Sequence, residues 1–163
     1  MSLLIAQLET VMRELLAEQQ QLLGALDAQL VALRTFRIDQ INNATKDQET
    51  VRLRIARIDQ RRKHVIAQIL RTHRNLSKPT LTKIAELFPE RSIFLIQLRD
   101  ELVNILAQIQ ERTNLINKIA SGVVNHLNGT VRVIAQAAAG PATYSRNGNV
   151  SMPGKVSTLS AVG

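Results

Sequence analysis

The sequence predicts an all-α protein: an elongated antiparallel helical bundle, or coiled coil, of three long helical segments and one short helix, followed by a disordered C-terminal tail. Apolar residues recur at intervals of three and four through most of the chain, which is the periodicity of amphipathic helices. Only 2% of the 163 residues are aromatic, so Leu, Ile, Val and Ala must fill the core, and they suit narrow contacts between helices. Glycine, proline and serine gather after residue 139. We therefore expect a helical bundle at 1–139 and a flexible tail at 140–163.

The first predicted helix begins near Leu4 and carries one apolar stripe. The stripe consists of Leu4, Leu8, Val11, Leu15 and Leu22. No glycine or proline interrupts the helix before Gly24. Gly24 is a helix-stop signal, and Asp27 is suited to cap a new helix because its carboxylate accepts hydrogen bonds from the next turn. We expect an elbow between two helices at Gly24–Asp27, with a kinked continuous helix as the alternative.

The second predicted helix runs from about Ala28 to Arg74. Its apolar positions are Leu30, Leu33, Ile38, Ile41, Val51, Ile55, Ile58, Val65 and Ile69. The polar run Asn42–Asp47 weakens its middle, but the run contains no proline or glycine. We expect the helix to persist through it. A turn there is the alternative, because Asn and Asp favour turns.

Proline marks the boundaries of a short third helix. Pro79 lacks an amide donor and disfavours a helical conformation at the preceding residue. Thr80 can cap a helix from Leu81 to about Phe88. Pro89 then opens the last helix, at the position where a missing amide costs little.

The last predicted helix, from about residue 90 to 138, has the most regular pattern of the chain. Its heptad seam is Leu95, Leu98, Leu102, Ile105, Ile109, Ile116, Ile119 and Val123. Arg112 occupies the one skipped position of the seam. Ile96, Val103 and Leu106 form a second apolar face, so this helix should contact more than one neighbour, as helices of a bundle do.

The net charge of +8 is unevenly distributed along the chain. Residues 1–33 carry a net charge of −3, residues 34–74 carry +7, and residues 75–163 carry +4. An acidic first helix beside a basic second helix predicts an antiparallel pair held by complementary charges. Nucleic-acid binding is the competing interpretation of the basic run Arg52, Arg54, Arg57, Arg61, Arg62 and Lys63. These bases surround the helix and no aromatic side chain lies among them, which favours a solvated helix face.

The chain lacks the residue patterns of an enzyme or a metal protein. It has no cysteine, and no two of its histidines, His64, His73 and His126, have the i, i+4 spacing of a helical zinc pair. No glycine-rich phosphate loop occurs. We expect no enzymatic activity, no metal and no cofactor. The chain has no apolar run long enough to span a membrane, and its start lacks a basic signal region, so we expect the protein in the cytoplasm.

The end of the last helix, Ile116–Ala139, is unusually apolar. Between residues 113 and 145 the charged residues are Lys118 and Arg132 alone. This segment is either a surface that binds a partner or a part of the core that packs on the elbow at Asp27.

The order of these elements resembles the FlgN family of flagellar export chaperones, and the likeness spans nearly the whole chain. Three sequence features carry the resemblance. They are the segment Leu22-Leu23-Gly24-Ala25-Leu26-Asp27-Ala28, the pair Asn114 and Asn117, and the motif Gly140-Pro141-Ala142-Thr143-Tyr144-Ser145-Arg146-Asn147-Gly148.

The resemblance implies a cytoplasmic, non-enzymatic type III export chaperone. It would bind the C-terminal helical segments of the hook-associated proteins FlgK and FlgL, prevent their premature assembly and deliver them to the export gate. Tyr144 and Gly148 would dock at the export gate protein FlhA, in transient contact with the membrane export apparatus. The client-binding residues implied are Ile116, Ile119, Val123, Leu127 and Val131.

The resemblance implies neither a nucleic-acid partner nor a small-molecule substrate, and a homodimer is compatible with it. The alternative function is a basic coiled-coil scaffold or a nucleic-acid-binding module. The salt dependence of binding distinguishes the chaperone from the nucleic-acid-binding module. Phosphate binding weakens steeply as the salt concentration rises, whereas an apolar groove keeps its affinity.

Overall fold

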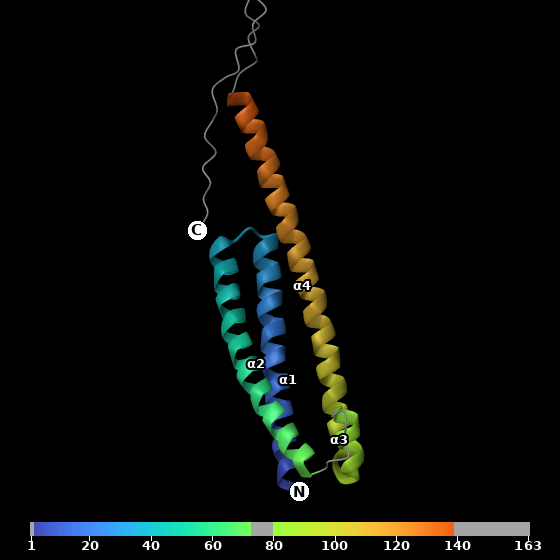
Figure 1. The fold of residues 1–163 in the computed structure, drawn as a ribbon. Helices are drawn as coiled ribbons and strands as arrows, with labels where there is room; N and C mark the ends of the chain where they lie inside the picture. Colours follow the sequence, from blue (N-terminus) through green and yellow to red (C-terminus); the bar gives the residue numbers. More distant parts are fainter. Residues whose placement is uncertain (1, 73–79, 139–163) are drawn as a thin grey trace, which may run out of the picture. The chain divides into compact units, whose positions relative to one another are not determined.

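The fold is all-α in a computed structural model that describes residues 2–72 and 80–138 (Figure 1). Its helices are α1 (Ser2–Arg34), α2 (Ile38–Thr72), α3 (Leu81–Leu87) and α4 (Pro89–Ala138). Neither described range contains a strand. Three long helices and one short helix confirm the predicted fold class. The predicted tail at 140–163 lies outside the described residues.

The chain divides into two compact units, Met1–Ala120 and Ser121–Gly163. In the first unit α1 and α2 lie side by side and antiparallel, and the first part of α4 follows α1 (Figure 1). The described part of the second unit is the remainder of α4. The first unit therefore ends within α4, whereas the predicted limit of the bundle at residue 139 lies outside the described residues.

The predicted elbow at Gly24–Asp27 was wrong, because α1 continues through it to Arg34. Leu22, Leu26 and Leu30 recur every four residues and are all buried. Burying a leucine side chain stabilises by about 1.5–3 kcal/mol, whereas a glycine within a helix costs about 1 kcal/mol relative to alanine. Three buried leucines therefore outweigh one glycine, and the helix stays continuous.

The turn between α1 and α2 lies at Thr35–Arg37, about ten residues later than predicted. The Arg37 amide donates to the carbonyl of Ala32 (3.0 Å), and the Phe36 amide donates to the carbonyl of Leu33 (3.3 Å). With Phe36 at φ 53°, this is the Schellman arrangement that ends many helices. Glycine usually occupies the left-handed position, which costs a side-chain-bearing residue roughly 1–2 kcal/mol. Because phenylalanine rather than glycine occupies this position, the sequence carries no local signal that predicts the turn.

Helix α2 begins at Ile38 and persists through the polar run Asn42–Asp47, as predicted. Within and just after the run, Ala44 and Gln48 are buried. The Gln48 Nε2 donates to the Gln29 Oε1 of α1 (2.8 Å). Contact with α1 therefore holds this stretch in the helix, and the alternative of a turn is wrong.

The predicted start signals of α3 and α4 are confirmed. The Thr80 hydroxyl accepts a hydrogen bond from the Lys83 amide (3.3 Å), which caps α3. On α3, Ile84 and Ala85 are buried. Pro89 is the first residue of α4. The predicted break at Pro79 lies outside the described residues.

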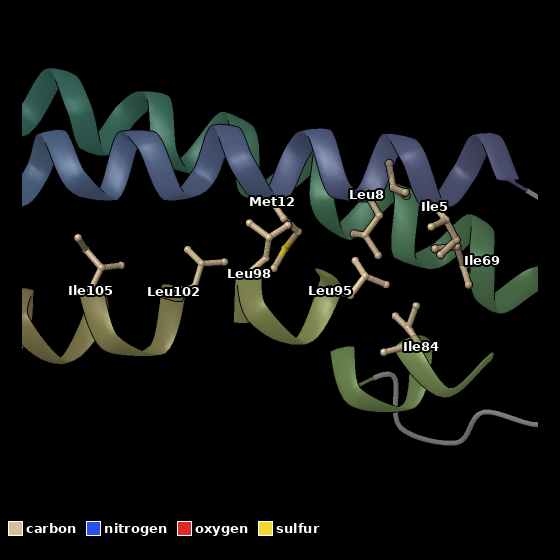
Figure 2. Close-up of a cluster of buried hydrophobic side chains, with 11 residues drawn as sticks. Ile5, Leu8, Met12, Ile69, Ile84, Leu95, Leu98, Leu102 and Ile105 are labelled. Carbon is tan, nitrogen blue, oxygen red and sulfur yellow. The ribbon is translucent and has the colours of Figure 1, made fainter. Parts of the chain in front are cut away.

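Two clusters of buried side chains form the core of the first unit. The first core cluster joins α1, α2, α3 and α4 (Figure 2). It contains Ile5, Leu8, Met12, Val65, Ile69, Ile84, Ala85, Leu95, Leu98, Leu102 and Ile105. The second core cluster contains Leu22, Leu26, Leu30, Val51 and Ile116. The seam predicted for the last helix thus supplies core residues to both clusters.

The second apolar face predicted for α4 is only partly covered. Ile96 packs against the first core cluster, whereas Val103 and Leu106 are exposed. In the first unit this face therefore meets fewer neighbours than its composition predicted.

Candidate functional site

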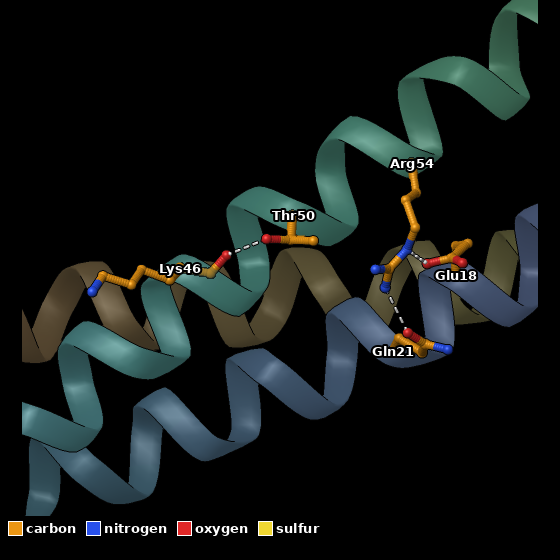
Figure 3. Close-up of polar contacts among 5 residues, drawn as sticks. All are labelled: Glu18, Gln21, Lys46, Thr50 and Arg54. Carbon is orange, nitrogen blue, oxygen red and sulfur yellow. Dashed lines mark hydrogen bonds and ion pairs between the residues drawn. The ribbon is translucent and has the colours of Figure 1, made fainter.

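Complementary charges join the acidic α1 to the basic α2, as predicted. The Arg61 Nη1 lies 2.6 Å from the Glu14 Oε2. The Arg54 Nε lies 2.9 Å from the Glu18 Oε2, and its Nη2 donates to the Gln21 Oε1 at 2.8 Å (Figure 3). These pairs are partly exposed, so each adds little to stability, but they match early α1 to late α2 and so favour the antiparallel register.

Most bases of the basic run on α2 have an ion-pair partner within the chain. The Asp59 carboxylate pairs with Arg62 (2.7 Å) and Lys63 (2.9 Å). Burial raises the pKa of Asp59, but the hydrogen bonds and charges of Lys63 and Arg62 outweigh burial and leave that pKa lowered. With the pairs to α1, four of the six predicted bases hold an intrachain partner. Arg52 and Arg57 are exposed and form no ion pair with another described residue. This pattern favours a solvated helix face over a phosphate-binding surface.

Arg112, the skipped position of the α4 seam, has a specific partner on α1. Its Nε lies 2.7 Å from the Asp27 Oδ1. The prediction that Asp27 caps a new helix was therefore wrong, since Asp27 lies inside α1 and pairs with α4. A charged pair at this position aligns α4 with α1 beside the second core cluster.

An exposed apolar stripe lies on α4 within Ser121–Ala138, the described part of the second unit. We define the α4 stripe as four residues that recur at spacings of three and four and are each more than half exposed. They are Val124 (54%), Leu127 (56%), Val131 (64%) and Ile134 (61%). Leu127 and Ile134 follow Ile109 and Ile116 by eighteen residues, which is five helical turns. In the sequence, Leu127 and Ile134 therefore share the helical phase of the seam residues Ile109 and Ile116.

The five predicted client-binding residues fall into two groups. Ile116 is buried in the second core cluster, Ile119 packs against that cluster, and Val123 is half-buried. Leu127 and Val131 are exposed. Client binding by these five residues stays a prediction. Of the five, Leu127 and Val131 are accessible to a partner. The predicted docking residues Tyr144 and Gly148 lie outside the described residues.

The predicted client-binding residues leave out two members of the α4 stripe, Val124 and Ile134. Both lie in the apolar segment Ile116–Ala139 that the sequence marks as a possible partner surface. The spacing of three and four residues that links Val124, Leu127, Val131 and Ile134 was the signal that would have found them.

The α4 stripe is suited to a partner helix. An isolated helix of about this length is marginally stable in water, and Gly122 and Gly129 weaken it further. Arg132 is the one Asp, Glu, Lys or Arg in the described part of this unit. A partner that covers the apolar side chains would therefore gain from their burial at little cost in desolvated charge.

The described residues offer no arrangement for metal chemistry. No group of three or more Asp, Glu or His side chains among them is placed to hold a metal ion. His64 and His126 are exposed, and His73 lies outside the described residues. Within residues 2–72 and 80–138, no helix combines the length and the apolar character needed to cross a membrane.

The family model described as FlgN protein matches residues 1–151, which is most of the chain. No curated protein and no solved structure matches the chain.

Proposed function

Because the chain belongs to the FlgN family, a family of flagellar export chaperones, we propose that it binds the C-terminal helical segments of the hook-associated proteins FlgK and FlgL. The complex keeps these segments from assembling early and brings them to the export gate. A chaperone acts through non-covalent contacts, so this function needs no catalytic residue. We place the activity in the cytoplasm, before export begins.

The observation that carries the proposal is the α4 stripe. Monomeric proteins seldom leave a contiguous apolar surface without a function. Side chains that recur every three and four residues match the side of an amphipathic helix, which is how helical clients dock. The stripe therefore fits the helical segments proposed as clients.

The energetics suit a client that is held and then released. A client segment that is unstructured when free loses conformational entropy as it becomes ordered on the chaperone. Burying apolar surface at about 25 cal/mol per Å² offsets that cost. The resulting affinity is expected near the micromolar range, tight enough to protect the client and weak enough to release it.

The test is isothermal titration of the full chain with the C-terminal segments of FlgK and FlgL from the same organism. We expect one-site binding that persists between about 0.15 M and about 0.5 M salt, because an apolar contact is not screened. Absence of binding at both salt concentrations contradicts the proposal. Binding that is lost at the higher salt indicates that the basic α2, rather than the α4 stripe, holds the client.

We further propose that Tyr144 and Gly148 dock the chaperone at the export gate protein FlhA. Both lie in the Tyr-x-x-x-Gly motif on which the resemblance to the family rests. The Tyr144→Ala variant should bind the client segments with unchanged affinity but show reduced export of FlgK and FlgL in cells. Client binding and export are measured on the same variant, with Ser151→Ala as a control in the same region. A loss of client binding in Tyr144→Ala refutes this division of labour between helix and tail.

A further inference from the structure

An open groove of about 690 Å³ lies between the start of α1 and the end of α2. Val11 and Val65 are buried and form its floor, and Leu3 and Ala6 line it with exposed side chains. Ala6 and the core residue Leu8 are two residues apart, which is about 200° around a helix. The exposed wall of the groove at Leu3 and Ala6 therefore lies on a different side of α1 from Leu8, while its floor residue Val65 belongs to the first core cluster.

A second hollow, of about 440 Å³, continues the same face of the helix pair. It is lined by Gln21, Gly24, Ala25, Ala28, Asp47, Thr50, Val51 and Arg54. On α1, Gly24 follows Leu3 by three heptads, and on α2, Thr50 precedes His64 by two heptads, so both hollows use the same sides of the two helices. From residue 3 to residue 28 this face extends roughly 38 Å, at 1.5 Å per residue.

The α2 edge of this face is basic. The exposed residues that recur along it at spacings of three and four are Lys46, Thr50, Leu53, Arg57, Gln60, His64, Ala67 and Arg71. None of them is acidic. Arg57 lies seven residues before His64 and Arg71 lies seven residues after it, on the same side of α2. Neither arginine forms an ion pair with another described residue. Asp47 is the one acidic side chain that lines either hollow.

We propose that this face of α1 and α2 binds an amphipathic helix of a partner protein that carries acidic residues along one flank. The apolar side chains of that helix lie over Val11 and Val65, and its acidic flank faces Arg57 and Arg71. Small residues such as Ala6 and Gly24 let its backbone approach closely, and a helix in a groove between two helices is a common mode of recognition. The site goes beyond the proposed function, because it contains no residue of the α4 stripe.

Charge and apolar character together select this occupant. A nucleic acid would use the bases, but the groove floor is apolar and no aromatic side chain lines it for base stacking. A second copy that docked through this same face would not offer an acidic flank from α1, because Glu14 and Glu18 already pair with α2. A helix that is apolar on one face and acidic on its flank matches both the floor and the edge.

The test uses the full chain and two synthetic helical probes of about 21 residues, which span about 30 Å as helices. Both probes carry Leu at helical spacing, and their flanking residues are Glu in one and Lys in the other. We expect the Glu probe to bind at least tenfold more tightly than the Lys probe. Arg57→Glu/Arg71→Glu should weaken the Glu probe at least tenfold and reverse the preference. Lys83→Glu/Lys118→Glu changes the net charge equally at exposed sites on α3 and α4 and should leave both affinities within twofold.

A second pair of substitutions tests the apolar part of the site. Leu3→Gln/Ala6→Gln keeps the charge and uses a residue that favours the helix, but it makes the groove wall polar. It should also weaken the Glu probe at least tenfold. Equal binding of both probes, or no effect of either groove variant, overturns the proposal. If the chain binds a mixed-sequence DNA or RNA duplex tightly, and Arg57→Glu/Arg71→Glu abolishes that binding, the face is a nucleic-acid site and the proposal is overturned. If the chain self-associates, and the same variant abolishes self-association, the occupant is a second copy and the proposal is likewise overturned. If the groove variants weaken the FlgK and FlgL segments while substitutions in the α4 stripe do not, the groove is the client site and a separate partner is excluded.

Discussion

Replacing Leu95 with alanine is expected to lower the free energy of unfolding by about 3 kcal/mol. The Leu95 side chain is fully buried where the start of α4 meets α1 and α3, beside Leu8 and Ile84 (Figure 2). The truncation removes apolar contacts and leaves a cavity that the surrounding helices fill only in part. Urea unfolding followed by circular dichroism should show a lower midpoint with an unchanged m-value. The thermal midpoint should fall by roughly 10 °C.

Ile93→Ala is the matched control for Leu95→Ala. Ile93 lies two residues earlier on α4, and its side chain is 73% exposed. Its truncation should change stability by less than about 0.5 kcal/mol, as is usual for surface substitutions. If both variants lose the same stability, α4 does not pack on α1 through Leu95, and the first core cluster is wrongly described.

Substituting glutamine for both Leu127 and Val131 is expected to weaken binding of the FlgK and FlgL segments about a hundredfold or more. Burying each apolar side chain contributes about 1.5–3 kcal/mol, and 1.4 kcal/mol corresponds to a factor of ten in affinity. Glutamine favours the helix, so the loss reports lost contacts rather than lost structure. Both side chains are exposed, so thermal stability should stay close to that of the unsubstituted chain. Isothermal titration at about 0.15 M salt gives the two dissociation constants.

Val133→Gln is the control on the other side of the same helix. Val133 is as exposed as Val131 and lies about 200° around α4 from it. It should leave client affinity within about twofold, since a bound helix covers one side of α4 only. Equal losses in Val133→Gln and in the double substitution would show that client binding is not confined to the α4 stripe.

Local signals predicted the helical stretches and the starts of α3 and α4, because these depend on residues close in sequence. Thr80 and Pro89 mark helix starts through their own hydrogen-bonding capacity and backbone geometry. The seam from Leu95 to Ile116 is visible as a periodicity of the sequence, and its residues are buried where α4 packs against other helices. Sequence analysis placed the first turn wrongly because it took Gly24 for the stop, whereas Phe36 adopts the left-handed conformation.

Sequence alone determined the all-α class, the order of the helices and the charge pairing of α1 with α2, because periodicity, capping and net charge are properties of short stretches of chain. The tertiary structure decided which apolar residues are covered. Ile116 and Leu127 belong to the same pattern, yet Ile116 is buried among α1 and α2 side chains while Leu127 is exposed. It also decided that Asp27 pairs with Arg112, eighty-five positions away. Burial and pairing of this kind depend on neighbours distant in sequence, which no local pattern records.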